Sequence, residues 1–184
     1  MRVISGTAKG QRLFAPKGLK TRPTADRVKE SLFNIIAGAV EGAAVLDLYA
    51  GAGSLAIEAL SRGAAAVVLV ESDKSAAAAI DRNLVSTGSA ERATVIQAPV
   101  NRALDRLVAS GQVFDLIFLD PPYKISKAEL EIVLEEAAGC LAKSGLAILE
   151  HRPDLPELEP GGGLFLSDGR RYGDTALSFY KKRD

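Results

Sequence analysis

The stretch DLYAGAGSL at residues 47–55 decides how this chain folds. It overlaps the end of an apolar segment, 44–49, that reads as a buried strand, and it leads into a helical pattern at 55–62 that stops at Gly63. Glycines at a strand-to-helix turn let a ligand approach the backbone closely, and the helix N-terminus offers free N–H groups and positive dipole. The stretch therefore predicts a ligand-binding turn in an α/β fold.

From this turn onward, apolar strands and helices alternate. Continuous apolar strands separated by helices are typical of a parallel sheet covered on both faces. Near the end of the chain, a turn-rich link around 169–173 separates two short apolar segments and predicts a terminal hairpin. The expected strands are 44–49, 66–71, 93–97, 114–120, 146–150, 164–167 and 176–180, and the expected helices are 55–62, 75–86, 100–109 and 127–142.

The first 40 residues follow a different pattern. Residues 2–5 and 12–14 predict a short two-stranded unit, which Pro16 and Gly18 close. Apolar residues at helical spacing then predict an amphipathic helix over 24–38. We expect a single domain over 1–184, made of an N-terminal extension (1–40) and a core (41–184).

Charge is distributed unevenly along the chain. The net charge is +0, yet residues 1–30 hold eight basic against two acidic residues, and residues 170–183 hold five against one. Two basic ends on one small domain favour a polyanion bound from one side. No apolar run approaches the roughly 18 residues of a membrane span, and a single cysteine, Cys140, rules out an internal disulfide. We therefore expect a cytoplasmic protein, with a monomer as the default.

Two acidic residues suggest what the glycine turn binds. Glu71 ends the second strand, where a carboxylate can accept hydrogen bonds from both hydroxyls of a ribose. Asp47 sits where it would repel a pyrophosphate but attract a cationic amino-acid group. A dinucleotide oxidoreductase is the competing interpretation, because Gly51, Gly53 and Ala56 nearly fit that fingerprint. S-adenosylmethionine fits better, since it has a ribose and an α-ammonium but no phosphate.

Other residues complete the predicted cofactor site. Gln97, in the loop after the third strand, could bond the adenine edge or be merely solvated. Ser54 could bond the cofactor carboxylate or simply cap the helix. The predicted cofactor contacts are Asp47, Tyr49, Gly51, Gly53, Ser54, Glu71, Gln97 and Ala98.

The sequence Asp-Pro-Pro-Tyr at residues 120–123 supplies the chemistry. It follows the fourth strand, whose end is expected to border the crevice where α/β proteins bind ligands. Pro121 and Pro122 restrict the backbone, so Asp120 is held in a preset geometry, and Tyr123 offers a ring on which a base can stack. Acceptors placed against an exocyclic amine favour positive charge on its nitrogen as it attacks a methyl group. The loop has no cysteine, which argues against C5 methylation of pyrimidines.

The choice of Asp at position 120 favours guanine as the target. A carboxylate only accepts hydrogen bonds, whereas an amide both accepts and donates. The pairing edge of guanine offers two adjacent donors, N1–H and the N2 amino group, while adenine offers one donor beside an acceptor. We therefore assign Asp120, Pro121 and Tyr123 to catalysis. The predicted substrate contacts are Arg22, Thr24, Arg27, Lys29, Pro122 and Arg171.

With these motifs placed, the chain resembles the Rossmann-like class I methyltransferases, and more narrowly the bacterial small-subunit (16S) rRNA guanine-N2 methyltransferases of the RsmD family. The resemblance implies a doubly wound, seven-stranded sheet with an antiparallel C-terminal hairpin. It also implies S-adenosylmethionine as cofactor, and as substrate one guanine of 16S rRNA in assembled or assembling 30S subunits. Gln97 departs from the family, which commonly has an acidic residue or Asn there. The resemblance rests on residues 2–6, 9–10, 21–34, 47–53, 57–63, 120–123 and 171–175.

Two alternatives stay open. Adenine-N6 methyltransferases of DNA or RNA, and protein-glutamine methyltransferases, use the same Pro-Pro-Tyr chemistry but usually carry Asn in place of Asp120. A cofactor-binding RNA module without activity is the other, although intact Asp47, Glu71 and Asp120 argue against it. The mechanism needs no histidine, so we expect His151 to be a structural or surface residue, and we expect no metal.

Overall fold

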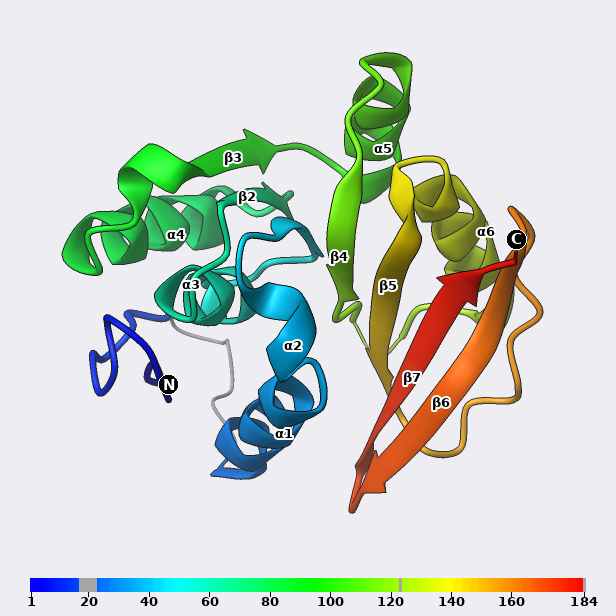
Figure 1. Cartoon of the computed structure of the whole chain (residues 1–184), viewed down its shortest axis with the longest axis horizontal. Helices are drawn as coiled ribbons and strands as arrows, with labels where there is room; N and C mark the ends of the chain where they lie inside the picture. The colour runs from blue at the N-terminus through cyan, green and yellow to red at the C-terminus, as the bar shows by residue number, and fades with distance from the viewer. Residues whose placement is uncertain (17–22, 123, 184) are drawn as a thin grey trace.

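The computed structural model describes residues 1–16, 23–122 and 124–183, with the side chains of residues 23–25 left out. Its centre is a seven-stranded sheet in the order β3-β2-β1-β4-β5-β7-β6 (Figure 1). The strands β1 to β5 run parallel, and β7 pairs antiparallel with both β5 and β6. The strands are β1 (Ala44–Leu48), β2 (Ala66–Glu71), β3 (Ala93–Gln97), β4 (Phe114–Leu119), β5 (Leu141–His151), β6 (Leu164–Tyr172) and β7 (Thr175–Lys182).

Helices cover both faces of the parallel part of this sheet. Successive residues of a strand point to opposite faces, and in β1 Val45 and Leu46 accordingly enter two different buried clusters. One cluster includes α1, α3 and α4, and the other includes α5 and α6. The doubly wound fold expected from the sequence is confirmed. The helices are α1 (Pro23–Ile35), α2 (Ala37–Val40), α3 (Ser54–Ser61), α4 (Lys74–Ser86), a 3₁₀ turn η1 (Ala90–Arg92), α5 (Val100–Ala109) and α6 (Lys127–Ala138).

The strand β1 lies between β2 and β4, so the strand order reverses beside it. In open α/β sheets, the crevice outside the carboxyl ends of the strands at such a reversal is where ligands bind. The turn at 49–53 and the loop at 120–122 both open into this crevice. None of the helices in the described part of the chain has the length and apolarity needed to span a bilayer.

Two element boundaries differ from those expected. The helix expected over 127–142 ends at Ala138, because the Cys140 carbonyl accepts the Phe114 N–H at 2.8 Å and draws the chain into the sheet. Strand β5 therefore begins at Leu141, five residues earlier than expected. The link expected around 169–173 is largely strand, because β6 stays paired with β7 up to Tyr172. A shift in register near residue 167 allows this pairing to continue.

The N-terminal hairpin expected from the sequence is reduced to an isolated antiparallel bridge between Arg2 and Arg12. The backbone N–H groups of Ile4 and Ser5 donate instead to the Glu58 carboxylate on α3, at 2.7 and 3.0 Å. Gly6 allows this docking: its φ is +82°, and a Cβ there would lie 1.7 Å from the Ser61 carbonyl oxygen. Only glycine fits such a close backbone approach.

Candidate active site

Four carboxyl side chains gather at the carboxyl ends of four neighbouring strands. They are Glu71 on β2, Asp47 on β1, Asp120 directly after β4 and Glu150 on β5. The alternation along the strands directs Asp47, Glu71 and Glu150 away from the α5–α6 face, because their strand neighbours enter the cluster on that face. These neighbours are Leu46, Leu48, Val70 and Leu149. The crevice is therefore acidic on the side that carries α1 and α3.

Asp47 lies beneath the glycine turn and is only 1% exposed. Its Oδ2 accepts the Ala56 N–H at 3.1 Å, which ties the end of β1 to the first turn of α3. Burial raises the pKa of Asp47 to about 8, and the neighbouring charges of Asp120 and Glu71 act in the same direction. A cation bound beside this carboxyl would offset its cost of ionisation. Such an environment suits the α-ammonium group predicted for this position.

The turn itself has the backbone geometry that its glycines predict. Gly51 and Gly53 have φ values of +58° and +78°, and Gly53 is the residue that precedes α3. The Gly51 N–H donates to Glu71 at 2.8 Å, while the other oxygen of Glu71 accepts the Asp73 N–H at 2.8 Å. Glu71 thus fixes the turn after β1 relative to the loop after β2. Its place at the strand end remains compatible with the predicted ribose contact.

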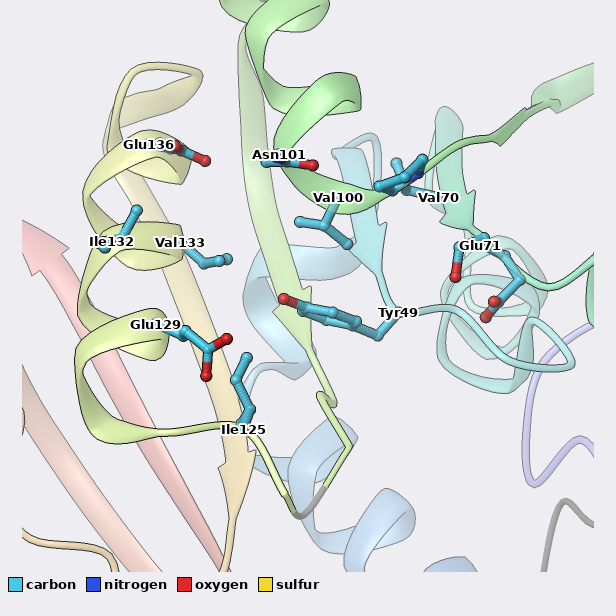
Figure 2. A pocket seen from close by; sticks show the side chains of 12 residues that line it. Tyr49, Val70, Glu71, Val100, Asn101, Ile125, Glu129, Ile132, Val133 and Glu136 are labelled. Atoms are coloured by element: carbon cyan, nitrogen blue, oxygen red, sulfur yellow. The ribbon is translucent and has the colours of Figure 1, made fainter.

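Tyr49 also has a positive φ, 62°, which is unusual for a bulky residue. Figure 2 shows its ring extending from the end of β1 toward α6, across a cavity of about 400 Å³. Burial first, and then the charges of Glu129 and Glu136, raise the pKa of Tyr49 to about 12. The cavity also reaches Glu71, so two predicted cofactor residues line the same space.

The loop after β3 contributes to this cavity without Gln97. Gln97 is exposed and does not line this cavity, whereas the following Pro99 and Val100 do. The Ala98 N–H donates to the Glu71 carbonyl oxygen at 3.1 Å, so the loop lies beside the end of β2. The predicted adenine contact of Gln97 remains a prediction.

Asp120 is accessible to solvent at the crevice, yet the protein around it removes enough water to raise its pKa to about 6. Pro121 is buried and Pro122 is exposed, and the Pro122 carbonyl accepts the Ile125 N–H at 3.0 Å. Tyr123 lies outside the described residues. The loop therefore presents Asp120 from a backbone that is anchored on both sides.

Glu150 is a site residue that the sequence analysis missed. It is half-buried, and burial together with the nearby charge of Asp120 raises its pKa to about 8. A signal was present in the sequence, because Glu150 ends an apolar strand as Glu71 does, in a fold that brings parallel strand ends together. The next residue, His151, is engaged at both ring nitrogens, by the Arg152 carbonyl and the Ser178 hydroxyl, each at 2.8 Å.

Lys29 requires a correction. It was expected to contact RNA phosphate, but its side chain is 5% exposed and its Nζ lies 3.6 Å from Glu58 Oε2. Burial lowers its pKa, despite the Glu58 charge. The Nζ also donates to the Arg2 carbonyl at 2.7 Å and to the Ser54 hydroxyl at 2.9 Å. The structure thus places Lys29 and the predicted cofactor residue Ser54 inside one internal network, with Glu58 as a partner that the sequence analysis missed.

The remaining predicted substrate residues divide into two groups. Arg27 on α1 and Arg171 on β6 are exposed, whereas Arg22 and the side chain of Thr24 lie outside the described residues. The two exposed arginines come from elements that touch, because the Ser31 and Tyr172 hydroxyls are 2.5 Å apart. Figure 1 shows α1 and the β6–β7 turn at the same end of the sheet.

Comparisons with known proteins agree with this fold. The family model described as Conserved hypothetical protein 95 matches residues 1–181. The YlbH protein of Bacillus subtilis is 40% identical over 183 residues, which cover 100% of both chains. Ribosomal RNA small subunit methyltransferase D of Escherichia coli K12 is 37% identical over 150 residues, or 82% of this chain and 74% of that protein. The solved structure of a hypothetical protein from Thermus thermophilus shares 31% identity and a TM-score of 0.85, covering 98% of this chain and 99% of that one.

Proposed function

The chain belongs to the RsmD family of ribosomal RNA methyltransferases, and we propose that it transfers a methyl group from S-adenosylmethionine to the exocyclic N2 of a guanine in 16S rRNA. The substrate we propose is the assembled or assembling 30S subunit, and we propose that the protein acts as a monomer in the cytoplasm. One observation carries this proposal. The chain brings Asp120 to the same crevice as the glycine turn and Glu71, because β4 and β2 both flank β1.

The residues around the turn fit the methyl donor by their chemistry. Asp47 is a buried carboxyl for which a cation is the natural partner, and Glu71 is a carboxyl at the strand end where a ribose binds. The turn at Gly51 and Gly53 lets the ligand lie close to the backbone. When bound there, S-adenosylmethionine supplies an activated methyl group on a sulfonium sulfur.

Asp120 prepares the nucleophile. Its carboxylate accepts hydrogen bonds from the target amino group, which holds the nitrogen in line with the methyl group and stabilises the positive charge that develops there. A pKa of about 6 leaves Asp120 ionised at neutral pH. Tyr123 provides the surface on which the base stacks. We expect Tyr123→Ala to bind the cofactor as the wild type does and to turn over more slowly.

Guanine is supported by the acceptor-only chemistry of Asp120, as argued from the sequence. The RNA-binding rim that we propose consists of Arg27 on α1 and Arg171 on β6, together with Arg22. Charge reversal at Arg22 and Arg27 should weaken RNA binding and flatten its dependence on salt, because fewer phosphate contacts release fewer counterions. An unchanged slope would place the RNA elsewhere.

The decisive experiment is transfer of labelled methyl from S-adenosylmethionine to small ribosomal subunits that lack the modification. DNA and naked total RNA serve as control substrates. We expect the label in N2-methylguanine from the subunit RNA, lost in Asp120→Ala and kept in the matched control Asp81→Ala, whose side chain is exposed on α4. Label in N6-methyladenine, or in DNA alone, would overturn the proposed substrate.

A further inference from the structure

We propose that Glu150 is a specificity-determining residue of the substrate site, where its carboxylic acid donates a hydrogen bond to the O6 oxygen of the guanine whose N2 amine faces Asp120. This inference rests on the proposed function and extends it from the target amine to the whole pairing edge of the base.

The pairing of β4 with β5 brings the two carboxyls together. Leu119 and Leu149 are partners in the register of these parallel strands, and both belong to the cluster on the α5–α6 face. The residues that follow them, Asp120 and Glu150, are therefore neighbours at the carboxyl ends of adjacent strands. Glu150 is a half-buried neighbour of the accessible Asp120.

Among the residues that the structure describes, no hydrogen bond or ion pair involves the side chain of Asp120 or Glu150. The carboxyls beside them differ, since Asp47 accepts the Ala56 N–H and Glu71 accepts two backbone N–H groups. Two neighbouring carboxyls whose oxygens have no partner among the described residues are open to a ligand that supplies hydrogen bonds.

Both carboxyls have pKa values above the ordinary range. Burial raises the pKa of Asp120 to about 6, and burial with the Asp120 charge raises that of Glu150 to about 8. Between these values the two neighbouring carboxyls share one proton, which we place on Glu150. On its other side Glu150 pairs in register with the apolar Leu177 of β7. Along its own chain, His151 is hydrogen-bonded at both nitrogens, and Arg152 lies 3.5 Å from Asp154.

A neutral acid beside a carboxylate complements guanine. The pairing edge of guanine presents an acceptor at O6 and donors at N1 and N2, in that order. Protonated Glu150 offers the donor that O6 requires, and the two oxygens of Asp120 accept from N1–H and N2–H. Adenine carries an amino donor where guanine has O6. A site built to hydrogen-bond a polar group rejects bases that cannot match it, because its own polar groups are left unpaired.

The test compares Glu150→Gln and Glu150→Ala with the wild type in single-turnover methylation of small subunits between pH 6 and 9. The amide of Gln can donate to O6 at any pH, so the rate of this variant at pH 7 should persist above pH 8. The wild type should slow there as Glu150 ionises. Glu150→Ala should be about 10- to 100-fold slower at pH 7, the worth of one such hydrogen bond. Glu157→Gln, an exposed acid beyond β5, is the matched control.

A change in the base tests the contact itself. In subunits reconstituted with 6-thioguanine at the target, the sulfur is a weak acceptor, so the wild type should slow while Glu150→Ala should treat both bases alike. The role of Glu150 is refuted if all three proteins discriminate equally between guanine and 6-thioguanine. It is also refuted if the rate of Glu150→Gln still falls above pH 8. Absence of N2-methylguanine in the wild type would instead refute the proposed function.

Discussion

The ammonium group of Lys29 donates a hydrogen bond to the Ser54 hydroxyl at 2.9 Å. Lys29 belongs to α1, in the extension that carries the proposed RNA contact Arg27, and Ser54 is the first residue of α3, directly after the glycine turn. This one bond therefore connects the substrate side of the protein with the cofactor side.

Loss of the Lys29 charge should destabilise the fold strongly. In Lys29→Met, the buried Glu58 keeps Arg62 but loses its second cation, and removal of one partner from a buried ion pair costs about 3–5 kcal/mol. Urea unfolding measures the change. Lys127→Met is the matched control, because its pair with Glu131 is exposed and should be worth about 0–1 kcal/mol. A loss of unfolding free energy in Lys29→Met as small as that in Lys127→Met would show that the Lys29 network does not stabilise the fold.

Asp47 should make the fold less stable as the pH rises. Its folded pKa, about 8, lies above the ordinary 3.8, so unfolding releases a proton between these values. The stabilisation is complete below pH 4 and lost as the pH rises through 8, with a slope of at most about 1.4 kcal/mol per pH unit for this group. Glu150 and Asp120 contribute in the same direction.

Urea unfolding of the cofactor-free protein at pH 5 and pH 8 tests this sign. Asp47→Asn keeps an acceptor for the Ala56 N–H but cannot ionise, so it should lose less stability between the two pH values than the wild type. Identical pH dependence in the two proteins would mean that Asp47 is already ionised in the fold.

Asp120 should impose an acid limit on catalysis. Protonation near its pKa of about 6 removes the acceptor for the target amine, so the single-turnover rate should fall as the pH drops through 6. Asp120→Asn should lack this limb and react about 100- to 1000-fold more slowly at pH 7. Its affinity for the cofactor, measured by calorimetry, should stay at the wild-type value. If the single-turnover rate of Asp120→Asn still falls as the pH drops through 6, the titration of another group causes the decline.

The hydroxyl pair of Ser31 and Tyr172 should behave as one interaction. Ser31→Ala and Tyr172→Phe each remove it, and each should cost about 0.5–1.5 kcal/mol of unfolding free energy. The double variant should cost no more than the larger single loss, because the second change has nothing left to break. Additive losses would indicate that the two hydroxyls act separately.

Much of the fold could be predicted from the sequence, because strongly apolar strands and glycine-ended helices specify it locally. The strand boundaries of β2 and β3 and both ends of α5 agree with the expected ranges. Where the expected structure was wrong, the cause is a hydrogen bond to a residue that is distant in the sequence. The helix expected to run through Cys140 stops because the Cys140 carbonyl accepts the Phe114 N–H of β4. The segment at residues 2–14 is docked on α3 because Glu58 accepts the N–H groups of Ile4 and Ser5.

The residues of the candidate site likewise divide into those that could be predicted from the sequence and those that could not. Asp47 and Asp120 could be found because each belongs to a motif with its own local signature, and Glu71 because it ends the strand that follows the glycine turn. Lys29 was misassigned because a basic residue on an amphipathic helix gives no sign that its far end reaches a buried carboxylate such as Glu58. Glu150 is marked in the sequence only by its place at the end of an apolar strand, and the pairing of β5 with β4 brings it to Asp120.

The place of β7 between β5 and β6 has a consequence for how the protein is made. Synthesis delivers β6 before β7, yet β6 has no place in the sheet until β7 has paired with β5. While residues 175–182 are still inside the ribosome, β5 is an open edge, and the partners of Arg171 and Tyr172 are missing. The proposed RNA-binding rim is therefore completed after the cofactor turn, so a nascent chain can form this turn before it can form the whole rim.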